Sequence, residues 1–240
     1  MSGITVLPLE GIPEIQEGDD LAALLGEAAA RAGGFEPGDV LVVAQKAVSK
    51  AEGRVLALEE VEPSDAAREH AGEGDPRHVE AILRETVRVV RSRPPLVIAE
   101  TRHGFVCASA GVDASNAPGL GTVVLLPLDP DASARALHER LGVAVIVSDS
   151  FGRPFRLGTT DVAIGVAGLP PLLDHRGTRD RVGYELKTTQ VAVADEIAAA
   201  AELVMGKTDG IPAAIVRGLA LEGDGSARDL VMPPDRDLFR

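Results

Sequence analysis

The chain has 240 residues and a formal net charge of −13; 45% of the residues are hydrophobic, 2% are aromatic and none is tryptophan. This composition excludes an intrinsically disordered chain and predicts a globular protein with a core of Val, Leu, Ile and Ala. A chain this acidic repels nucleic-acid backbones and anionic membranes. No apolar run approaches the roughly 20 residues of a membrane span, so we expect neither a nucleic-acid-binding nor a membrane protein.

Other features of the sequence favour the cytoplasm. The chain begins Met1-Ser-Gly-Ile-Thr, without the charged and apolar segments of a signal peptide. A single cysteine, Cys107, forbids an internal disulfide. It lies in an apolar stretch, where we interpret it as a small buried hydrophobic residue.

Hydrophobic runs and turn residues predict strands and helices in the first half of the chain. Strands are predicted over residues 4–8 and 40–44, and an Ala/Leu-rich helix over residues 21–31, ending at Gly33-Gly34. In the charged section 59–93, helices begin at Pro63-Ser64 and Asp75-Pro76, and an apolar stripe from Val79 to Val90 predicts that the second packs one face on the protein. Residues 96–99 and 105–110 are predicted strands joined by a turn at His103-Gly104, and residues 123–127 are a further strand.

The second half continues the same mixture. Helices are predicted over residues 134–140 and 194–205, strands over 143–149, 161–168 and 211–216, a charged loop over 170–183 and a half-exposed strand over 185–191. This order favours an α+β fold with mixed sheets over a regular doubly wound one, and neither a Walker A loop nor a Rossmann Gly-x-Gly-x-x-Gly is present. We expect residues 1–240 to form a single unit, either one large domain or two interlocked subdomains.

Two predicted strands end in carboxylates. The apolar run 104–110 leads into the turn Ala110-Gly-Val-Asp-Ala-Ser-Asn, which displays Asp113, and the run 143–149 ends at Asp149, followed by Ser150. A turn capped by Asp113 is the structural interpretation of the first corner. Two acidic strand ends together indicate instead a site for a hard cation and a phosphate-bearing substrate.

Basic residues near these strands have two interpretations each. The chain has 4 Lys against 20 Arg, and two of these lysines, Lys46 and Lys50, follow the buried strand 40–44. These two lysines are interpreted either as phosphate ligands or as solvated side chains. Arg153 and Arg156 could neutralise an anionic substrate or lie on the surface. We interpret four histidines as surface or structural residues: His70, His78, His103 and His138.

Seven blocks of the sequence, taken in order, resemble one known family. They are Leu7-Pro-Leu-Glu-Gly-Ile-Pro with Gly18-Asp-Asp-Leu; Asp39-Val-Leu-Val-Val with Ser49-Lys-Ala-Glu-Gly-Arg; Ala110-Gly-Val-Asp-Ala-Ser-Asn; Leu126-Pro-Leu-Asp-Pro-Asp; Ser148-Asp-Ser with Gly152-Arg; Val193-Ala-Asp-Glu-Ile-Ala-Ala; and Ile211-Pro-Ala-Ala-Ile-Val-Arg-Gly. The family is the coenzyme F420-0:L-glutamate ligases, or γ-glutamyl ligases of the deazaflavin coenzyme. Ending near Phe239, the chain resembles the stand-alone form without an additional flavin-binding domain.

The resemblance implies a GTP-dependent amide ligation. GTP phosphorylates a carboxylate of the deazaflavin precursor F420-0, the α-amine of L-glutamate attacks the acyl phosphate, and GDP and phosphate leave. Later rounds would extend a γ-linked glutamate tail. The resemblance further implies an intertwined homodimer of an unusual α+β fold, a site between two domains, two divalent ions (magnesium or manganese) and, in some members, potassium.

The resemblance also assigns roles to residues. Asp113, Asp149 and Lys50 would be catalytic, with Asp113 and Asp149 on the divalent ions and Ser150 as a ligand of the second ion. The nucleotide would contact Ile12, Pro13, Glu14, Ile15, Gln45, Lys46, Lys50, Asn116 and the loop Gly206, Lys207, Thr208, Asp209 and Gly210. This loop departs from the family pattern, because archaeal relatives carry an acidic metal ligand where this chain has Lys207. Asp209 could replace it, or the loop could simply end a helix.

Two other functions fit the same residues. One is a different metal-dependent phosphotransferase acting on a small molecule, which would leave a stable phosphorylated product. The other is a non-catalytic module that binds a nucleotide or coenzyme without glutamate-dependent turnover.

Overall fold

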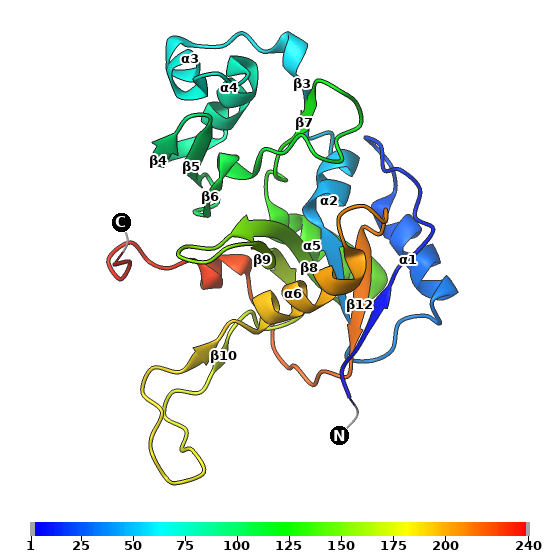
Figure 1. Ribbon diagram of the computed structural model, residues 1–240. Coiled ribbons are helices and arrows are strands. Elements are labelled where there is room, and N and C mark those ends of the chain that lie inside the picture. The colour runs from blue at the N-terminus through cyan, green and yellow to red at the C-terminus, as the bar shows by residue number, and fades with distance from the viewer. Residues whose placement is uncertain (1–2, 239–240) are drawn as a thin grey trace.

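A computed structural model describes residues 3–238 and is built around a five-stranded mixed sheet (Figure 1). In spatial order the strands are β1 (Thr5–Pro8), β12 (Ala213–Arg217), β2 (Val40–Ala44), β8 (Ala144–Gly152) and β9 (Thr159–Ala167). β2 and β8 pair in parallel, and the other neighbouring pairs are antiparallel. The carboxyl ends of β2 and β8 therefore meet at one edge of the sheet.

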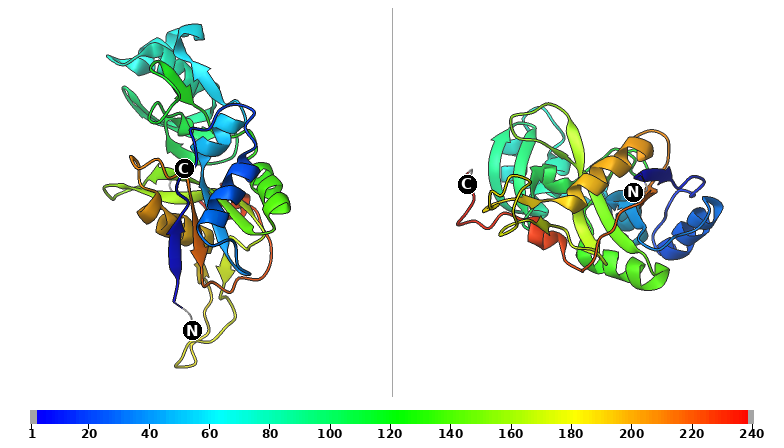
Figure 2. Two further views of the ribbon diagram at one scale, coloured as in Figure 1. Left: turned by 90° about the vertical axis from the view of Figure 1, so that its right-hand side faces the viewer. Right: turned by 90° about the horizontal axis from the view of Figure 1, so that it is seen from below.

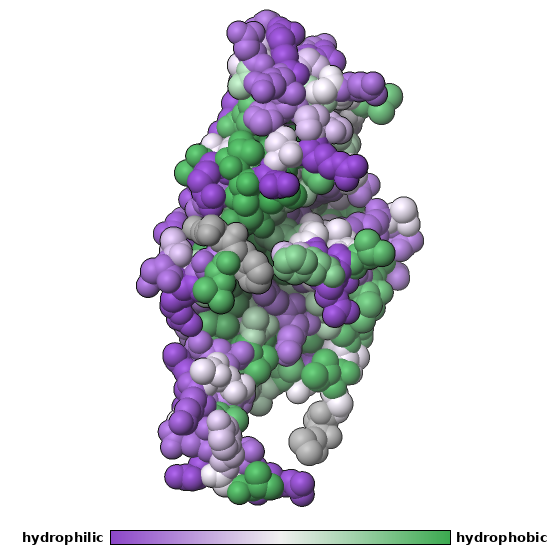
Figure 3. All heavy atoms as spheres, turned by 60° about the vertical axis from the view of Figure 1, so that its left-hand side comes forward, coloured by the Kyte–Doolittle hydropathy of each residue, from purple (hydrophilic) through white to green (hydrophobic). Residues whose placement is uncertain are grey.

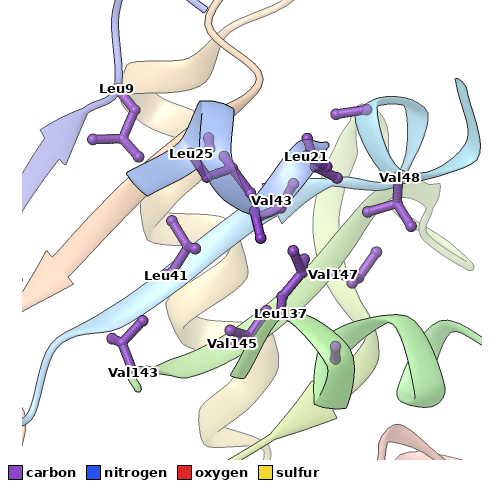
Figure 4. Close-up of a cluster of buried hydrophobic side chains, with 14 of the residues drawn as sticks. Leu9, Leu21, Leu25, Leu41, Val43, Val48, Leu137, Val143, Val145 and Val147 are labelled. Carbon is purple, nitrogen blue, oxygen red and sulfur yellow. The ribbon is translucent and has the colours of Figure 1, made fainter. Parts of the chain in front are cut away.

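Helices cover both faces of this sheet. On one face, α1 (Leu21–Arg31), α2 (Gln45–Ala51) and α5 (Pro130–Leu141) enclose a core that includes Leu41 and Val145 (Figure 4). On the other, α6 (Val193–Met205) packs against residues that include Val42 and Ile146. Successive strand residues point to opposite faces, so the continuous apolar runs of β2 and β8 supply both cores.

Side-chain caps fix where two of these helices begin. The Asp20 carboxylate accepts a 3.0 Å hydrogen bond from the N–H of Ala23 at the start of α1, and Asp129 accepts one of the same length from Ala132 in α5. α5 ends at Leu141 and is capped by Gly142, whose φ of 69° glycine adopts without strain.

Residues 55–125 form a smaller part, here called the small lobe, at one end of the molecule (Figures 1 and 2). Its elements are β3 (Val55–Ala57), α3 (Asp65–Ala71), α4 (Pro76–Arg84), β4 (Thr86–Arg93), β5 (Leu96–Thr101), β6 (Val106–Ala108) and β7 (Thr122–Val124). β4, β5 and β6 make one antiparallel sheet, and β3 pairs with β7. Buried residues such as Val61, Ile82 and Val97 give the small lobe a core of its own.

At the opposite end, residues 175–189 form an arm that projects from the molecule (Figures 1 and 2). The arm begins after β10 (Leu173–Asp174) and returns into β11 (Gln190–Val191), which pair with each other. Val182 and Tyr184 on the arm are 81% and 63% exposed. In Figure 3 the far end of this projection carries one apolar area within a mostly hydrophilic surface.

The α+β fold class with mixed sheets is confirmed, but the local predictions for residues 86–90 and 185–189 are wrong. The helix expected to carry its stripe to Val90 ends at Arg84, and residues from Thr86 onward form β4. The reason is a run of β-branched residues, Thr86, Val87, Val89 and Val90, whose restricted χ1 angles favour a strand.

The predicted strand over residues 185–191 is wrong except for Gln190–Val191. The other residues lie in the arm and bond within it, as in the 2.8 Å hydrogen bond from the N–H of Leu186 to the carbonyl of Thr178. The residues that follow the strand 40–44, for which the sequence predicts no element, form the helix α2.

No helix within residues 3–238 combines the length and the apolar character needed to cross a lipid bilayer.

Candidate functional site

A cleft of about 580 Å³ lies where the strand ends of the main sheet face the small lobe. Of the residues to which the resemblance assigns a role, those lining it are Ile12, Pro13, Glu14, Ile15, Gln45, Lys46, Lys50, Asp113, Asn116, Asp149, Ser150, Gly206, Lys207 and Gly210. Thr208, Asp209, Arg153 and Arg156 are not among the lining residues. Segments far apart in the chain thus meet in one place.

The parallel pairing of β2 and β8 explains why α2 and Asp149 meet. Ala44 at the end of β2 pairs with Ser148 of β8, and β8 continues through Asp149 to Gly152. The first turn of α2 and Asp149 therefore lie at the same edge of the β2–β8 pair. Functional groups of α/β sheets gather at such carboxyl ends.

Lys46 and Lys50 lie one turn apart on α2 and both line the cleft. The Nζ of Lys46 lies 2.6 Å from Oδ2 of Asp113 and also donates to the carbonyl of Ser115 at 2.8 Å. Lys50 is 7% exposed, and its Nζ pairs with the carboxylate of Glu14. The interpretation of these two as solvated lysines is therefore wrong.

Gln45 supplies a buried donor at the start of α2. It is 1% exposed, and its Oε1 accepts a 2.9 Å hydrogen bond from the hydroxyl of Ser49. Its Nε2 has no hydrogen-bond partner among the described residues. A buried amide without a partner costs ~1–3 kcal/mol, so a ligand acceptor at this position would recover that free energy.

Asp113 sits at the corner between the small lobe and the cleft. The corner contains the 3-10 turn Ser109–Gly111, in which Ser109 and Ala110 have positive φ angles of 55° and 49°. Burial works to raise the pKa of Asp113, but the hydrogen bond and charge of Lys46, with hydrogen bonds from Ser115, hold it below its ordinary value. Asp113 is thus ionised near neutral pH, and its carboxylate is suited to a cation.

A β-bulge precedes Asp149. The register of β8 against β9 shifts between Val147 and Ser148, where β9 carries the extra residue Ile164, and bulges of this kind are common next to functional sites. Burial raises the pKa of Asp149 to about 7; the N–H of Ser150 and the charge of Lys46 oppose this, and the charges of Asp161 and Asp113 add to it. A cation beside Asp149 would relieve that repulsion.

The neighbouring residues of β8 point to the other side of the strand. The hydroxyl of Ser148 donates to Oδ2 of Asp161 at 2.9 Å, and that of Ser150 donates to Oδ1 at 2.5 Å. The Nζ of Lys207 contacts the hydroxyl of Ser150. The end of β8 thus divides the cleft into an Asp113–Asp149 side and a Ser150–Asp161 side.

Sequence reasoning missed several lining residues, of which Asp161 and Glu202 carry charge. Asp161 begins a run that we identify as a strand from the sequence. Its pairing with Ser150 in the β8–β9 register could not be read from that run. Glu202 comes from α6, whose apolar pattern indicates packing and gives no sign of a site.

The histidines divide into two groups. Ring nitrogens of His70, His103 and His138 bond to the Ser92 hydroxyl, the Pro127 and Leu128 carbonyls and the Val143 carbonyl, respectively, in agreement with structural roles. His78 differs because it lines the cleft; its buried Nε2, like the buried Nδ1 of His103, lacks a hydrogen-bond partner within residues 3–238.

Cys107 is buried as expected, although it also lines the cleft. Burial raises the pKa of its thiol to about 12, and the charge of Asp149 adds to this. A thiol this weakly acidic is a poor nucleophile near neutral pH.

The donor set suits a hard cation. Within residues 3–238 no three His, Cys, Asp or Glu side chains converge to hold a metal ion by themselves. The Asp113–Asp149 side offers carboxylate oxygens, whose mutual repulsion contributes to the raised pKa of Asp149. Magnesium is commonly held by one or two carboxylates, with water and substrate phosphates completing its shell, so the residues fit such an ion.

Comparison with known proteins gives a consistent result. The family described as F420-0:Gamma-glutamyl ligase matches residues 11–218. Proteins named coenzyme F420:L-glutamate ligase from Methanopyrus kandleri, Methanothermobacter thermautotrophicus and Archaeoglobus fulgidus are 50%, 48% and 44% identical to this chain. The matches cover 100%, 99% and 99% of the chain and 100%, 99% and 96% of those proteins. The chain therefore belongs to the F420-0:gamma-glutamyl ligase family.

Proposed function

We propose that this chain joins L-glutamate to the deazaflavin precursor F420-0 in a GTP-dependent amide ligation, and then adds further γ-linked glutamates. The observation that carries the proposal is the convergence of Lys46, Lys50, Asp113 and Asp149 in one cleft, in a chain whose full-length relatives bear the ligase name. Triphosphates need fixed positive charge, and carboxylates suit the divalent ion that accompanies them.

The proposed reaction has two steps. A carboxylate oxygen of F420-0 attacks the γ-phosphorus of GTP, the bond to the bridging oxygen breaks and GDP leaves. The amine of glutamate then attacks the acyl carbon, the amide forms, phosphate leaves and the amine loses a proton. Both encounters bring anions together, so electrostatic stabilisation dominates the catalysis.

The chain's own residues would position these groups. Lys46 and Lys50 on α2 would hold the phosphates, and the free Nε2 of Gln45 would donate to one acceptor of the nucleotide. The turn 12–15 and Asn116, which both line the cleft, would enclose the nucleoside. A magnesium or manganese ion, when bound at Asp113 and Asp149, would neutralise charge on the transferring phosphoryl group. A potassium requirement stays a prediction of the resemblance.

The proposal extends to the assembly and the location. Because the cleft uses residues of both the small lobe and the main sheet, we treat residues 1–240 as one ligase unit. We further propose a homodimer, supported by the projecting arm with exposed Val182 and Tyr184. GTP and L-glutamate are cytoplasmic metabolites, so we expect a cytoplasmic enzyme.

The test is product analysis with the purified chain, F420-0, GTP, L-glutamate and Mg²⁺ or Mn²⁺. We expect glutamylated F420-0 by mass spectrometry, with GDP and phosphate formed in equal amounts. Omitting glutamate should stop net product formation. A stable phosphorylated product would identify a kinase, and nucleotide binding without turnover would identify a binding module; either result contradicts the proposal.

A further inference from the structure

The two sides of the cleft differ in their balance of charge. On the Asp113–Asp149 side, two carboxylates share the ammonium of Lys46, which bonds to Asp113 at 2.6 Å. On the Ser150–Asp161 side, one carboxylate faces the ammonium of Lys207 through the hydroxyl of Ser150. When the carboxylates are ionised, the first side has a surplus negative charge and the second has none.

The carboxylate oxygens on the Ser150–Asp161 side already accept hydrogen bonds. Each oxygen of Asp161 accepts from a serine hydroxyl, at 2.9 Å from Ser148 and 2.5 Å from Ser150. The Ser150 oxygen in turn contacts the ammonium of Lys207. A divalent ion there would have to displace this ammonium or lie close to it, and like charges at contact distance repel strongly.

The backbone around Lys207 positions this residue at the cleft. α6 ends at Met205, Gly206 follows with a φ of 59°, and the carbonyl of Lys207 accepts a 3.1 Å hydrogen bond from Asn116. Three of the four lysines of the chain, Lys46, Lys50 and Lys207, line the cleft. Glu202 also lines it, without a hydrogen bond or ion pair to Asp161 or Lys207 among the described residues.

We infer that the site takes one divalent ion per chain, at Asp113 and Asp149, and that the ammonium of Lys207 is the fixed cation of the Ser150–Asp161 side. This inference rests on the proposed function, because the nucleotide phosphates complete the ion's shell. Lys207 would then contact phosphate oxygens directly, as a compact charge with three donors.

The test counts bound manganese. The chain is dialysed to equilibrium against Mn²⁺ and a non-hydrolysable imido analogue of GTP, and bound ion and nucleotide are measured per chain. Electron paramagnetic resonance then distinguishes one isolated Mn²⁺ from a pair, because ions about 3.5–4 Å apart, the spacing of two-metal sites, couple magnetically.

The parent should bind one Mn²⁺ per chain and give an uncoupled spectrum. Lys207→Glu recreates on the second side the two-carboxylate arrangement of the first, so it should bind two ions with a coupled spectrum. Lys207→Met removes the charge without adding a ligand; it should keep one ion and bind the nucleotide at least about 10-fold more weakly, or about 1.4 kcal/mol. Lys187→Glu, the same change in the arm, should behave as the parent.

Two ions in the parent, or one ion in a folded Lys207→Glu chain with unchanged melting temperature, would overturn the inference. The ion count is separate from turnover. A parent that glutamylates F420-0 but binds two ions contradicts the role of Lys207 alone, whereas a parent that makes no ligation product contradicts the proposed function.

Discussion

The Nδ2 of Asn116 donates a 3.1 Å hydrogen bond to the carbonyl of Lys207, which joins a corner of the small lobe to the loop after α6. Asn116 has a φ of 53°, a conformation that asparagine tolerates better than most residues. Both residues line the cleft, so Asn116 can fix the loop that presents Lys207 and, under the proposed function, also hold the nucleotide.

We expect GTP to support turnover far better than ATP. Guanine offers an acceptor at its six-position where adenine offers a donor, and a buried group left unpaired costs about 1–3 kcal/mol. Asn116→Ala should lower kcat/KM for GTP. A change in the ratio of kcat/KM for GTP to kcat/KM for ATP would show that Asn116 contacts the base. An unchanged ratio would show that it contacts phosphate or ribose. Asn116→Gly, which suits the positive φ, is the control for backbone strain. Equal use of ATP by the parent would contradict base recognition.

Asp113→Asn and Asp149→Asn should each abolish ligation while the fold stays intact. Both carboxylates line the cleft, and neutralising a metal ligand removes several kcal/mol of transition-state stabilisation. We expect at least a 100-fold loss of kcat, or about 2.7 kcal/mol, at limiting Mn²⁺. Circular dichroism checks the fold, and Asp235→Asn provides the same charge change at an exposed position outside the cleft. Parent-like turnover in either cleft variant would refute the assignment.

Asp149 should make the stability of the metal-free chain fall as the pH rises. Its pKa is about 7 in the folded chain and near the ordinary 3.8 when unfolded, so the folded state binds more protons between these values. The free energy of unfolding then decreases from about pH 4 to about pH 7. At ~1.36 kcal/mol per pKa unit the loss is on the order of 4 kcal/mol at most.

Urea unfolding of the parent and of Asp149→Asn across this range, in a chelating buffer, measures the effect. Asp149→Asn has no carboxyl group to titrate at this position. Its free energy of unfolding, relative to that of the parent, should therefore increase with pH. Asp113, whose pKa is lowered, contributes with the opposite sign in both chains, and this contribution cancels in the difference apart from its electrostatic coupling to Asp149. Parallel pH profiles for the two chains would be incompatible with the raised pKa.

The arm should be required for a homodimer. Val182 and Tyr184 are exposed on a projection that packs on no other part of the molecule in Figures 1 and 2, and apolar side chains in such a position indicate a partner surface. We expect a dimer by light scattering at micromolar concentration, and a shift toward monomer in Val182→Asp/Tyr184→Asp. Leu203→Asp, at an exposed position of α6, is the matched control. An active monomeric parent would rule the dimer out.

The sequence predicts the parts of this fold that local patterns determine. The limits of α1 and β2 and the starts of α3 and α4 follow from caps and apolar runs. The limits of β4 and of the arm do not follow from such local patterns, because they depend on whether a neighbouring strand is available for pairing. Periodicity alone cannot distinguish the end of α4 from the start of β4.

The same division applies to the site. Asp113 and Asp149 stand out because each follows an apolar strand, and Lys46 and Lys50 because lysines are rare in this chain. Asp161 begins a strand whose register places it opposite Ser150, and registers arise from tertiary pairing. Asp161 and the contact of Lys207 with Ser150 therefore became visible only in three dimensions.

The concentration of lysines in the cleft has a kinetic consequence. The chain carries −13 overall, yet Lys46, Lys50 and Lys207 all line one cavity. Glu14, Asp113, Asp149, Asp161 and Glu202 line the same cavity. Anionic substrates therefore meet repulsion at a distance, and attraction only at contact with the lysine ammonium groups. Mobile salt weakens the distant field first, since its screening length is about 8 Å at physiological ionic strength. Moderate salt should accordingly speed the encounter of this acidic protein with its acidic substrates, opposite to the behaviour of an enzyme that draws them in from afar.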